Sequence, residues 1–269
     1  MGKLNETKLQ ELQAAQAKGV VLGLNGISDV DVVPRLDIDV FLHNHPEAFN
    51  LFIIAFDKLQ NETKSNDRMG YFQIAGRNKL RMNTISCQLK KPTGIHGAPK
   101  IQWDNMGLKF NTNTTIQGGT PAGYCAHGTE TFPTWHRPYL VMLEQTLFLK
   151  MVEVANSYDE PHRAEYLSAV TNFRLPYWDY FRPRGGEVTF PGVLDGRETT
   201  YPFDYSLPRV FTEKDISVFA PPNNELKPLA RGNPFRSHPF NNDESGTIEW
   251  KDFAPQVRSQ ASSGMLPSN

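Results

Sequence analysis

The chain has 269 residues, and its 28 lysines and arginines nearly balance 29 aspartates and glutamates, for a formal net charge of -1. A chain this close to neutral offers no electrostatic basis for binding nucleic acid or an anionic membrane surface, so the sequence predicts neither partner. It also shows no apolar run long enough to span a bilayer, and its polar start lacks the basic and apolar parts of a secretory signal. We therefore expect a cytoplasmic protein with one sizeable core.

Two helices are predicted before residue 63. Residues 1–16 are polar and predict a short exposed helix, and an extended or strand-like lead-in follows at 20–24. Pro46 suits the first turn of a second helix, whose apolar face repeats at three- and four-residue steps: Phe49, Phe52, Ile53, Phe56 and Leu59. His43 and His45 alternate on an extended approach to it. They fit surface or capping histidines better than metal ligands, because no third donor is evident nearby.

Residues 127–144 carry the most informative pattern. His127 and His136 lie nine positions apart, and His127 follows Cys125 by two. Neutral imidazole is a ligand that suits copper, zinc, iron and nickel. His136 opens a helix with one apolar face: Tyr139, Leu140, Leu143, Leu147, Met151 and Val154.

The start of this helix can be placed from its residue types. Thr134 is a plausible N-cap, and Pro138 is tolerated only in a first turn, which puts His136 near the amino-terminal end. Glu144 lies two turns beyond Arg137 and could reach it or another buried cation. A buried helix with two ordinary histidines is the alternative for either histidine alone, but the combined pattern is more specific.

The combined pattern, Cys-x-His-Gly followed by Phe-Pro-x-Trp-His-Arg-x-Tyr-Leu and then Glu, resembles the first copper-binding motif of the tyrosinase, catechol oxidase and haemocyanin superfamily. It is most similar to fungal tyrosinases. The resemblance implies that three histidines hold each of two coppers, and that His127 and His136 belong to the first set. It also implies a thioether between Cys125 and His127 and a place for Phe132 at the substrate access. Arg137 and Glu144 are candidates for groups that orient the ligands.

A second segment, residues 71–76, resembles the family segment that leads directly into the first copper histidine. Here the expected continuation arrives late, at residues 94–97, and His96 is the best candidate for the first ligand. Between them lie residues 77–93, which are basic and lack a helical face. This insertion is either a solvated surface loop or a retained intron, and its clean interruption of the motif favours the intron. His96 as a loop residue without a role is the alternative.

Cys87 and Cys125 are the only two cysteines in the chain. A disulfide between them is possible, but the intron origin of Cys87 and the thioether expected at Cys125 argue against it. Two cysteines do not make a disulfide scaffold of the kind found in small secreted proteins.

Beyond the central helix, residues 161–172 predict another helix. Residues 174–179 resemble the family segment that packs under the copper site, so Tyr177 and Trp178 are expected to fill the core and Asp179 to orient a neighbour by hydrogen bonding. From Arg182 onward the chain is rich in Pro and Gly, which predicts irregular loops.

The second copper motif has no match. It needs a His-x-x-x-His pair and a later histidine, yet only His162 and His238 follow His136. The acidic residue and Asn that the family places beside the second copper are also unmatched. The resemblance covers roughly residues 30–240, and the chain resembles a truncated family member. Its expected organisation is an extension at 1–35, a first-copper half at 36–181 and a loop-rich remainder at 182–269.

These observations predict a mainly α fold, an incomplete helical-bundle copper core with long irregular loops. By resemblance the function is that of a polyphenol oxidase that oxidises monophenols and o-diphenols to o-quinones with O2, as in pigment formation. At most one copper is expected here, and apolar helix faces left exposed around Phe52 and Leu143 could pair with another chain. The alternatives are a non-catalytic relic that binds one copper or none, and a zinc hydrolase with Glu130 as its base.

Overall fold

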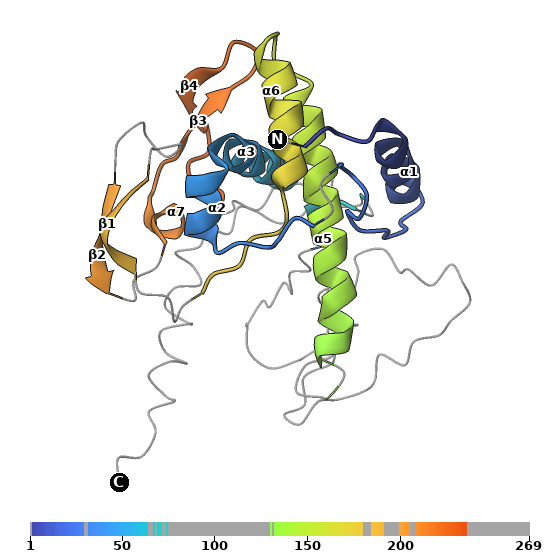
Figure 1. Cartoon of the computed structure of the whole chain (residues 1–269), viewed down its shortest axis with the longest axis horizontal. Coiled ribbons are helices and arrows are strands. Elements are labelled where there is room, and N and C mark those ends of the chain that lie inside the picture. Colours follow the sequence, from blue (N-terminus) through green and yellow to red (C-terminus); the bar gives the residue numbers. More distant parts are fainter. Residues whose placement is uncertain are drawn as a thin grey trace, which may run out of the picture. The chain divides into compact units, whose positions relative to one another are not determined.

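A computed structural model describes residues 2–29, 32–63, 67, 69–71, 74, 130, 132–179, 184–190, 199–204 and 208–235 (Figure 1). The chain divides into two compact units. The first contains Met1–Asp179 and Phe219–Glu225, and the second contains Tyr180–Val218 and Leu226–Asn269. The fold is mainly α, as the sequence predicted. None of the helices in the described part of the chain is long and apolar enough to cross a membrane.

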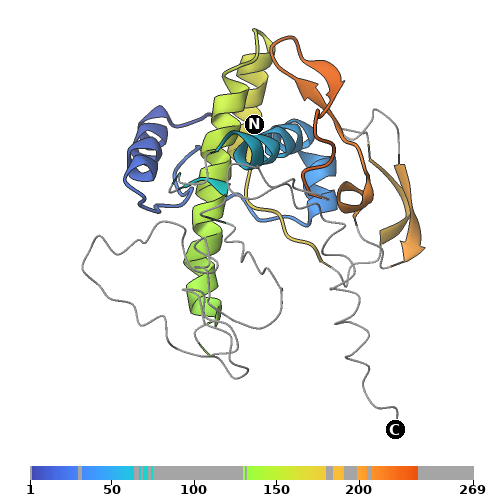
Figure 2. The same ribbon diagram turned by 180° about the vertical axis from the view of Figure 1, so that it is seen from behind.

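The first unit is built around one long helix, α5 (Phe132–Ala155). Helix α3 (Pro46–Glu62) packs against it, and Figures 1 and 2 show α1 (Glu6–Ala17) on the opposite side of α5 from α3. Helix α6 (His162–Ala169) and the 3-10 turn η1 (Val170–Asn172) follow α5 and contact both α3 and α5. The predicted helices therefore exist, and they meet in a shared core.

The core is aromatic where α3 meets its neighbours. Phe41, Phe49 and Phe173 are fully buried, and the ring centroids of Phe52 and Phe173 lie 5.6 Å apart. The expectation that the face around Phe52 is exposed is wrong, because η1 and the residues after it bring Phe173 onto that face. Tilted and edge-on ring pairs of this kind stabilise a core beyond the area they bury.

The approach to α3 is helical rather than extended. Asp37 caps a short helix, α2 (Ile38–Asn44), by accepting a hydrogen bond from the Asp39 amide, and His43 lies in its last turn. The prediction of an extended segment with alternating histidines is therefore wrong. His45 precedes Pro46 at the N-cap position of α3 but makes no capping hydrogen bond with its side chain. Burial lowers the pKa of His45, although Glu47 opposes that shift.

A buried polar cluster fastens the returning segment Phe219–Glu225 to α3 and α6. Asn50 donates to the Phe219 carbonyl at 2.9 Å and accepts from the Phe219 amide at 2.8 Å. Tyr158 donates to the same carbonyl, and its ring stacks on Tyr166 with centroids 4.1 Å apart. Burial raises the pKa of Tyr158 to about 12 and also raises the pKa of Tyr166.

The amino-terminal segment is attached to α5 by one buried amide. Gln145 accepts from the amides of Leu22 and Gly23 and donates to the Val20 carbonyl and the Gln16 side chain. Leu9, Leu12 and Ala15 are buried, so α1 is not exposed on all sides as predicted. Residues 20–24 form no strand, which leaves the extended alternative of the two predicted there.

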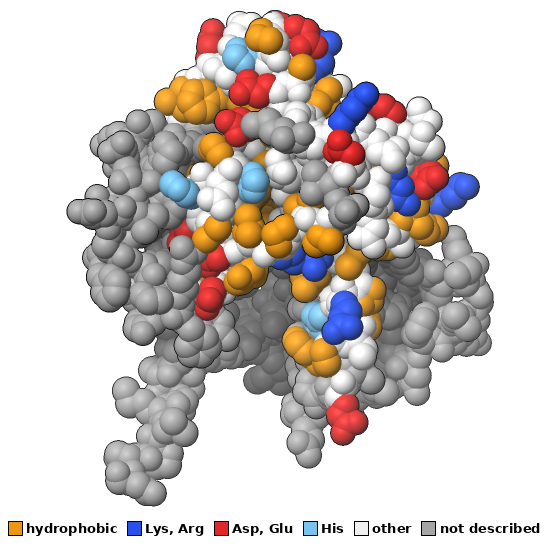
Figure 3. All heavy atoms as spheres, viewed as in Figure 1, with side chains coloured by type: hydrophobic (Ala, Val, Ile, Leu, Met, Phe, Trp, Pro, Cys, Tyr) orange, Lys and Arg blue, Asp and Glu red, His pale blue; other side chains and the backbone are white. Residues whose placement is uncertain are grey.

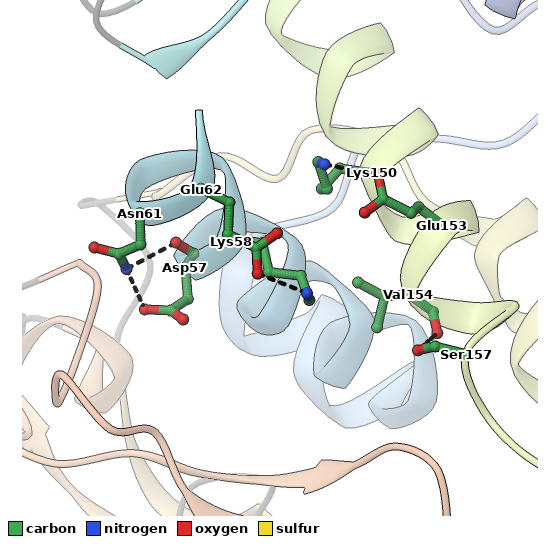
Figure 4. Close-up of polar contacts among 8 residues, drawn as sticks. All are labelled: Asp57, Lys58, Asn61, Glu62, Lys150, Glu153, Val154 and Ser157. Carbon is green, nitrogen blue, oxygen red and sulfur yellow. Dashed lines mark hydrogen bonds and ion pairs between the residues drawn. The ribbon is translucent and has the colours of Figure 1, made fainter. Parts of the chain in front are cut away.

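Helices α3 and α5 carry short-range polar contacts between residues close in sequence (Figure 4). Lys58 pairs with Glu62 at 2.7 Å, and Lys150 pairs with Glu153 at 2.6 Å. Asn61 donates to the carbonyl and side chain of Asp57, and Ser157 donates to the Val154 carbonyl just past the end of α5. Pairs spaced by three or four residues each contribute only tenths of a kcal/mol to helix stability. These contacts therefore make a small contribution to the stability of the fold.

The carboxyl-terminal part contains short elements that the sequence predicted only as loops. Strands β1 (Arg184–Phe190) and β2 (Thr199–Asp204) pair antiparallel, and β3 (Ser217–Ala220) pairs with β4 (Glu225–Pro228). A one-turn helix, α7 (Arg209–Thr212), lies between the two sheets in sequence. Asn233 is buried and donates to the carbonyls of Val210 and Glu213, which ties α7 to the end of this segment. The end of the predicted loop-rich remainder, residues 236–269, falls outside the described residues.

Candidate metal centre

The amino-terminal turns of α5 present His136. The helix begins at Phe132, so Thr134 lies inside it and is not its N-cap. Pro138 lies in the second turn rather than the first, where it has no N–H to donate within the helix. His136 is nevertheless close to the amino-terminal end of α5, as the sequence predicted.

One hydrogen bond defines the chemistry of the His136 ring. Its Nδ1 lies 2.7 Å from the Phe132 carbonyl oxygen, four residues earlier in the same helix. A carbonyl only accepts, so Nδ1 carries the hydrogen, and in the neutral ring the lone pair is on Nε2. Metal-bound histidines commonly use the second ring nitrogen in this way, because the bond fixes both tautomer and orientation. His136 therefore fits the role of a ligand through Nε2.

Aromatic neighbours restrict the ring further. The Phe132 ring centroid lies 3.9 Å from that of His136, and Trp135 stacks on Tyr139 at 5.5 Å. Tyr139 donates from its hydroxyl to the Ile74 carbonyl, which connects α5 to the segment that the sequence relates to the first ligand. Phe132 is 42% exposed and lies against a predicted ligand. That location is compatible with its predicted place at the substrate access.

The other predicted ligands lie outside the described residues. This applies to His96, to His127 and its candidate thioether partner Cys125, and to Cys87 with the insertion at 77–93. Within the part of the chain that the structure describes, no three His, Cys, Asp or Glu side chains are grouped to hold a metal. Glu130, the base required by the zinc hydrolase alternative, is exposed. The three-histidine set stays a prediction, and His136 is the member whose geometry can be stated.

Glu144 anchors α5 eight residues beyond His136. Its side chain is 5% exposed and accepts from Arg35 twice, at 3.1 Å from Nε and 3.0 Å from Nη2. It also accepts from the Leu175 amide at 2.7 Å. Of the predicted alternatives, the cation is thus Arg35 rather than Arg137, which is exposed. A forked arginine–carboxylate pair fixes both partners in orientation, so α5 is held against residues 35 and 175.

Residues 175–179 run beside the start of α2 without entering the core. The Ile38 amide donates to the Tyr177 carbonyl, the Tyr177 amide donates to the Leu36 carbonyl, and the Asp179 amide donates to Asp37. Tyr177 is 51% exposed and Trp178 is 38% exposed, so the prediction that they fill the core is wrong. Backbone pairing determines the position of this segment, and both side chains remain accessible. The orienting role of Asp179 stays a prediction.

Sequence reasoning missed Arg35, Asn50 and Gln145. The secondary structure around each of these residues is predicted by the neighbouring apolar residues alone, so the polar residue adds no signal. A signal existed only for Asp37, which precedes Ile38 as N-caps do. Long-range contacts of buried amides and arginines do not produce a repeating pattern of residue types, so the sequence does not predict them.

The described residues form a mainly α unit in which one histidine of fixed tautomer lies near the start of a long helix. Residues 88–264 match the family model described as the common central domain of tyrosinase, and the chain belongs to the tyrosinase family. A tyrosinase of Podospora anserina is 35% identical over 162 residues, which cover 60% of this chain and 24% of that protein. Polyphenol oxidase 2 of Agaricus bisporus is 32% identical, covering 54% of this chain and 21% of its own length.

Solved structures agree with this assignment. A copper-bound variant of active tyrosinase from Aspergillus oryzae, complexed with L-tyrosine, matches with a TM-score of 0.53 and 25% identity. The match covers 80% of this chain and 43% of that one. The chain therefore shares the fold of a tyrosinase core, and it spans about a quarter of the length of the curated relatives that it matches.

Proposed function

We propose that this chain forms the first-copper part of a tyrosinase-type polyphenol oxidase, with His96, His127 and His136 as the ligands. The observation that carries the proposal is the His136 ring, whose Nδ1–H is held by the Phe132 carbonyl so that Nε2 keeps the lone pair. Family membership and the copper-bound Aspergillus oryzae relative support copper as the metal. Copper bound here would supply the chemistry that lets O2 oxidise phenols.

The residues of this chain have separable tasks in that proposal. His136 donates through Nδ1 and offers Nε2, and Phe132 lies against its ring and limits its rotation. Because Phe132 is partly exposed, a phenol approaching His136 would meet its ring as an aromatic surface. Glu144 and Arg35 act at a distance by holding the helix that displays the histidine. The phenolic substrate follows by analogy with the L-tyrosine complex of the relative.

Copper stoichiometry tests the ligand set. We expect at most one tightly bound copper per chain after reconstitution, because three histidines match the first set and only His162 and His238 follow them in sequence. His136→Ala is expected to abolish this binding, whereas His43→Ala, an exposed position in α2, is expected to leave it unchanged. Retention of copper by the His136 variant would show that the ligand assignment is wrong.

Oxygen uptake tests the reaction. Oxidation of a catechol by O2 in this family uses both coppers, so we expect little or no turnover from the 269-residue chain as written, even with added copper. A copper titration of a variant lacking residues 77–93 asks whether that insertion disturbs the first site, with copper affinity as its readout. Robust turnover by the unmodified chain would mean that a second site is supplied in another way, for instance by a partner chain.

A non-catalytic relic is the second candidate. It is favoured by the isolation of His162, which lies beside Glu165 and Asn224 rather than beside another histidine in the described part of the chain. Metal analysis tests the first-copper role directly, because the relic binds one copper or none. A chain that takes up no copper under conditions that load a full-length relative would exclude the first-copper role and support the relic.

A further inference from the structure

Arg174 is a half-buried cation that forms no direct ion pair with a described carboxylate, although Glu144 is close enough to interact with its charge. Its guanidinium donates to the carbonyls of Phe173 at 2.6 Å and Leu24 at 3.4 Å, and no carboxylate within the described residues forms an ion pair with it. The carboxylate beside it, Glu144, already accepts two hydrogen bonds from Arg35 and one from the Leu175 amide. Buried charges are normally paired, so an unpaired guanidinium in this setting requires an explanation.

The local charge balance is positive. Two guanidiniums, those of Arg35 and Arg174, surround one carboxylate. Burial lowers the pKa of Arg174, Glu144 opposes that shift, and the charge of Arg35 adds to it. Each guanidinium has five N–H donors, and only two of them are used on each arginine. Six donors therefore have no partner among the described residues, around a site where those residues carry one excess positive charge.

The pair is also accessible. The Arg35 side chain is 48% exposed, and Arg174 is intermediate in exposure. Figure 3 shows positively charged atoms reaching the surface within an area of hydrophobic side chains, on the face that carries α2 and part of α5. A guanidinium at a half-dry surface binds an oxyanion more strongly than one surrounded by water, because the local dielectric screens it less.

We propose that Arg174 and Arg35 form a binding site for a small oxyanion, a phosphate or carboxylate group that completes the charge balance around Glu144. The site is distinct from the proposed copper site, since Glu144 lies eight residues beyond His136 on α5, about 12 Å along the axis. An arginine fork matches the oxygens of such a group, whereas a single lysine would supply only a point charge. Inorganic phosphate is the simplest probe, because it presents four oxygens and no other recognition feature.

The test is calorimetric titration of inorganic phosphate into the full-length, metal-free chain at constant ionic strength. We expect one phosphate per chain with a dissociation constant on the order of 1 mM, and a rise in the thermal midpoint of about 3 °C at tenfold excess over that constant. Arg174→Gln is expected to weaken binding at least about tenfold, since it removes both the charge and the fork. No copper is present, so the result is independent of the proposed oxidase function.

Two further variants keep the test decisive. Arg163→Gln removes another partly exposed arginine, one already paired with Glu160, and should leave phosphate binding unchanged. Arg174→Lys keeps the charge and should fold even if Arg174→Gln does not, yet bind phosphate several-fold more weakly because the fork is lost. Equal binding by the parent chain and Arg174→Lys, or no saturable binding by the parent chain, would overturn the proposal.

Discussion

The two halves of α5 differ in nearly every physical respect. From Met142 to Ala155 most side chains are buried, and three consecutive polar residues, Glu144, Gln145 and Thr146, are buried with their hydrogen bonds satisfied. From Phe132 to Val141 no side chain is buried among the described atoms. The first region holds the helix in place, and the second displays His136. Sites are most precise when they extend from an element that is held elsewhere, and α5 follows that arrangement.

The three buried polar residues reach three different partners because successive helical side chains point about 100° apart. Glu144 meets Arg35 and the Leu175 amide, Gln145 meets residues 20–23, and Thr146 accepts from Gln16 while donating to the Met142 carbonyl. One turn of helix thus connects segments more than a hundred residues apart. At the amino-terminal end of α5, Tyr139 also makes a long-range hydrogen bond, to the Ile74 carbonyl, but none of the described side chains from Phe132 to Val141 is buried. The comparison therefore predicts unequal effects of substitution along one helix.

The largest loss of stability is expected at Glu144. Glu144→Ala removes a nearly buried carboxylate and leaves the Arg35 charge and the Leu175 amide without their partner. We expect the free energy of unfolding to fall by about 3 kcal/mol, somewhat below the full cost of a broken buried pair because Arg35 is half-exposed. Urea unfolding of the parent chain and the variant measures this change in the free energy of unfolding. Glu153→Ala, which breaks only an exposed pair with Lys150, should change stability by less than about 0.5 kcal/mol. Equal losses of stability in Glu144→Ala and Glu153→Ala would show that the buried pair is no more important for stability than the exposed pair.

A smaller loss, confined to one segment, is expected at Gln145. Gln145→Ala leaves the amides of Leu22 and Gly23 without their acceptor, at a cost of about 2 kcal/mol. Hydrogen exchange should accelerate at residues 18–29 more than in α3. Gln13→Ala, at an exposed position of α1, is the matched control and should leave exchange unchanged. Uniform acceleration across the unit would mean that the segment does not open by itself.

Alkaline pH should weaken the far end of the helical unit through Tyr158. Its folded pKa of about 12 exceeds the unfolded value of 10.0 because of burial, so the native state holds this proton more tightly. The stabilisation is therefore complete below pH 10.0 and declines as pH rises toward about 12. Tyr158→Phe should flatten this decline. Comparison of the tyrosinate absorbance of the parent chain and Tyr158→Phe should assign to Tyr158 an ionisation near pH 12, and an ionisation of Tyr158 near pH 10.0 would contradict the burial argument.

The smallest effect on stability is expected at the display end. His136→Ala in the metal-free chain should alter the free energy of unfolding by no more than about 0.5 kcal/mol, because the ring is only partly buried. The same variant is expected to lose copper, so its stability and its metal binding should separate. A loss comparable to that of Glu144→Ala would show that His136 belongs to the structural half of α5.

The major helices were predictable because their apolar residues repeat with the helical period. Leu147, Met151 and Val154 of α5 are buried as predicted, whereas Leu140, on the same predicted face, is 44% exposed. Periodicity gives the orientation of a face but not the point along the helix where its neighbours end. Helix α2 was missed because seven residues give too short a period to distinguish a helix from an extended segment.

The sequence proposes which residues form the candidate site, and that assignment stays a prediction, but it gives no information on their geometry. Residue types and spacing singled out His136, and the match to the common central domain of tyrosinase supports the family on which that interpretation depends. The tautomer of His136 and its contact with Phe132 depend on where α5 begins, because the helix must already include Phe132 to bring its carbonyl and ring beside His136. The exposure of Tyr177 and Trp178 depends on which segment the backbone pairs with, and no local pattern encodes that choice.

The attachment of the amino-terminal segment through Gln145 has a consequence for sequence divergence. Three of its hydrogen bonds go to the main chain of Val20, Leu22 and Gly23, and every residue type except proline supplies the same donor and acceptor. The side chains at 20 and 22 are thus open to replacement without loss of the connection. Gly23 is not, because its φ of 73° and a Cβ position 3.3 Å from Val141 disfavour any larger residue. A single glutamine in α5 can therefore hold residues 20–23 while the side chains at positions 20 and 22 vary.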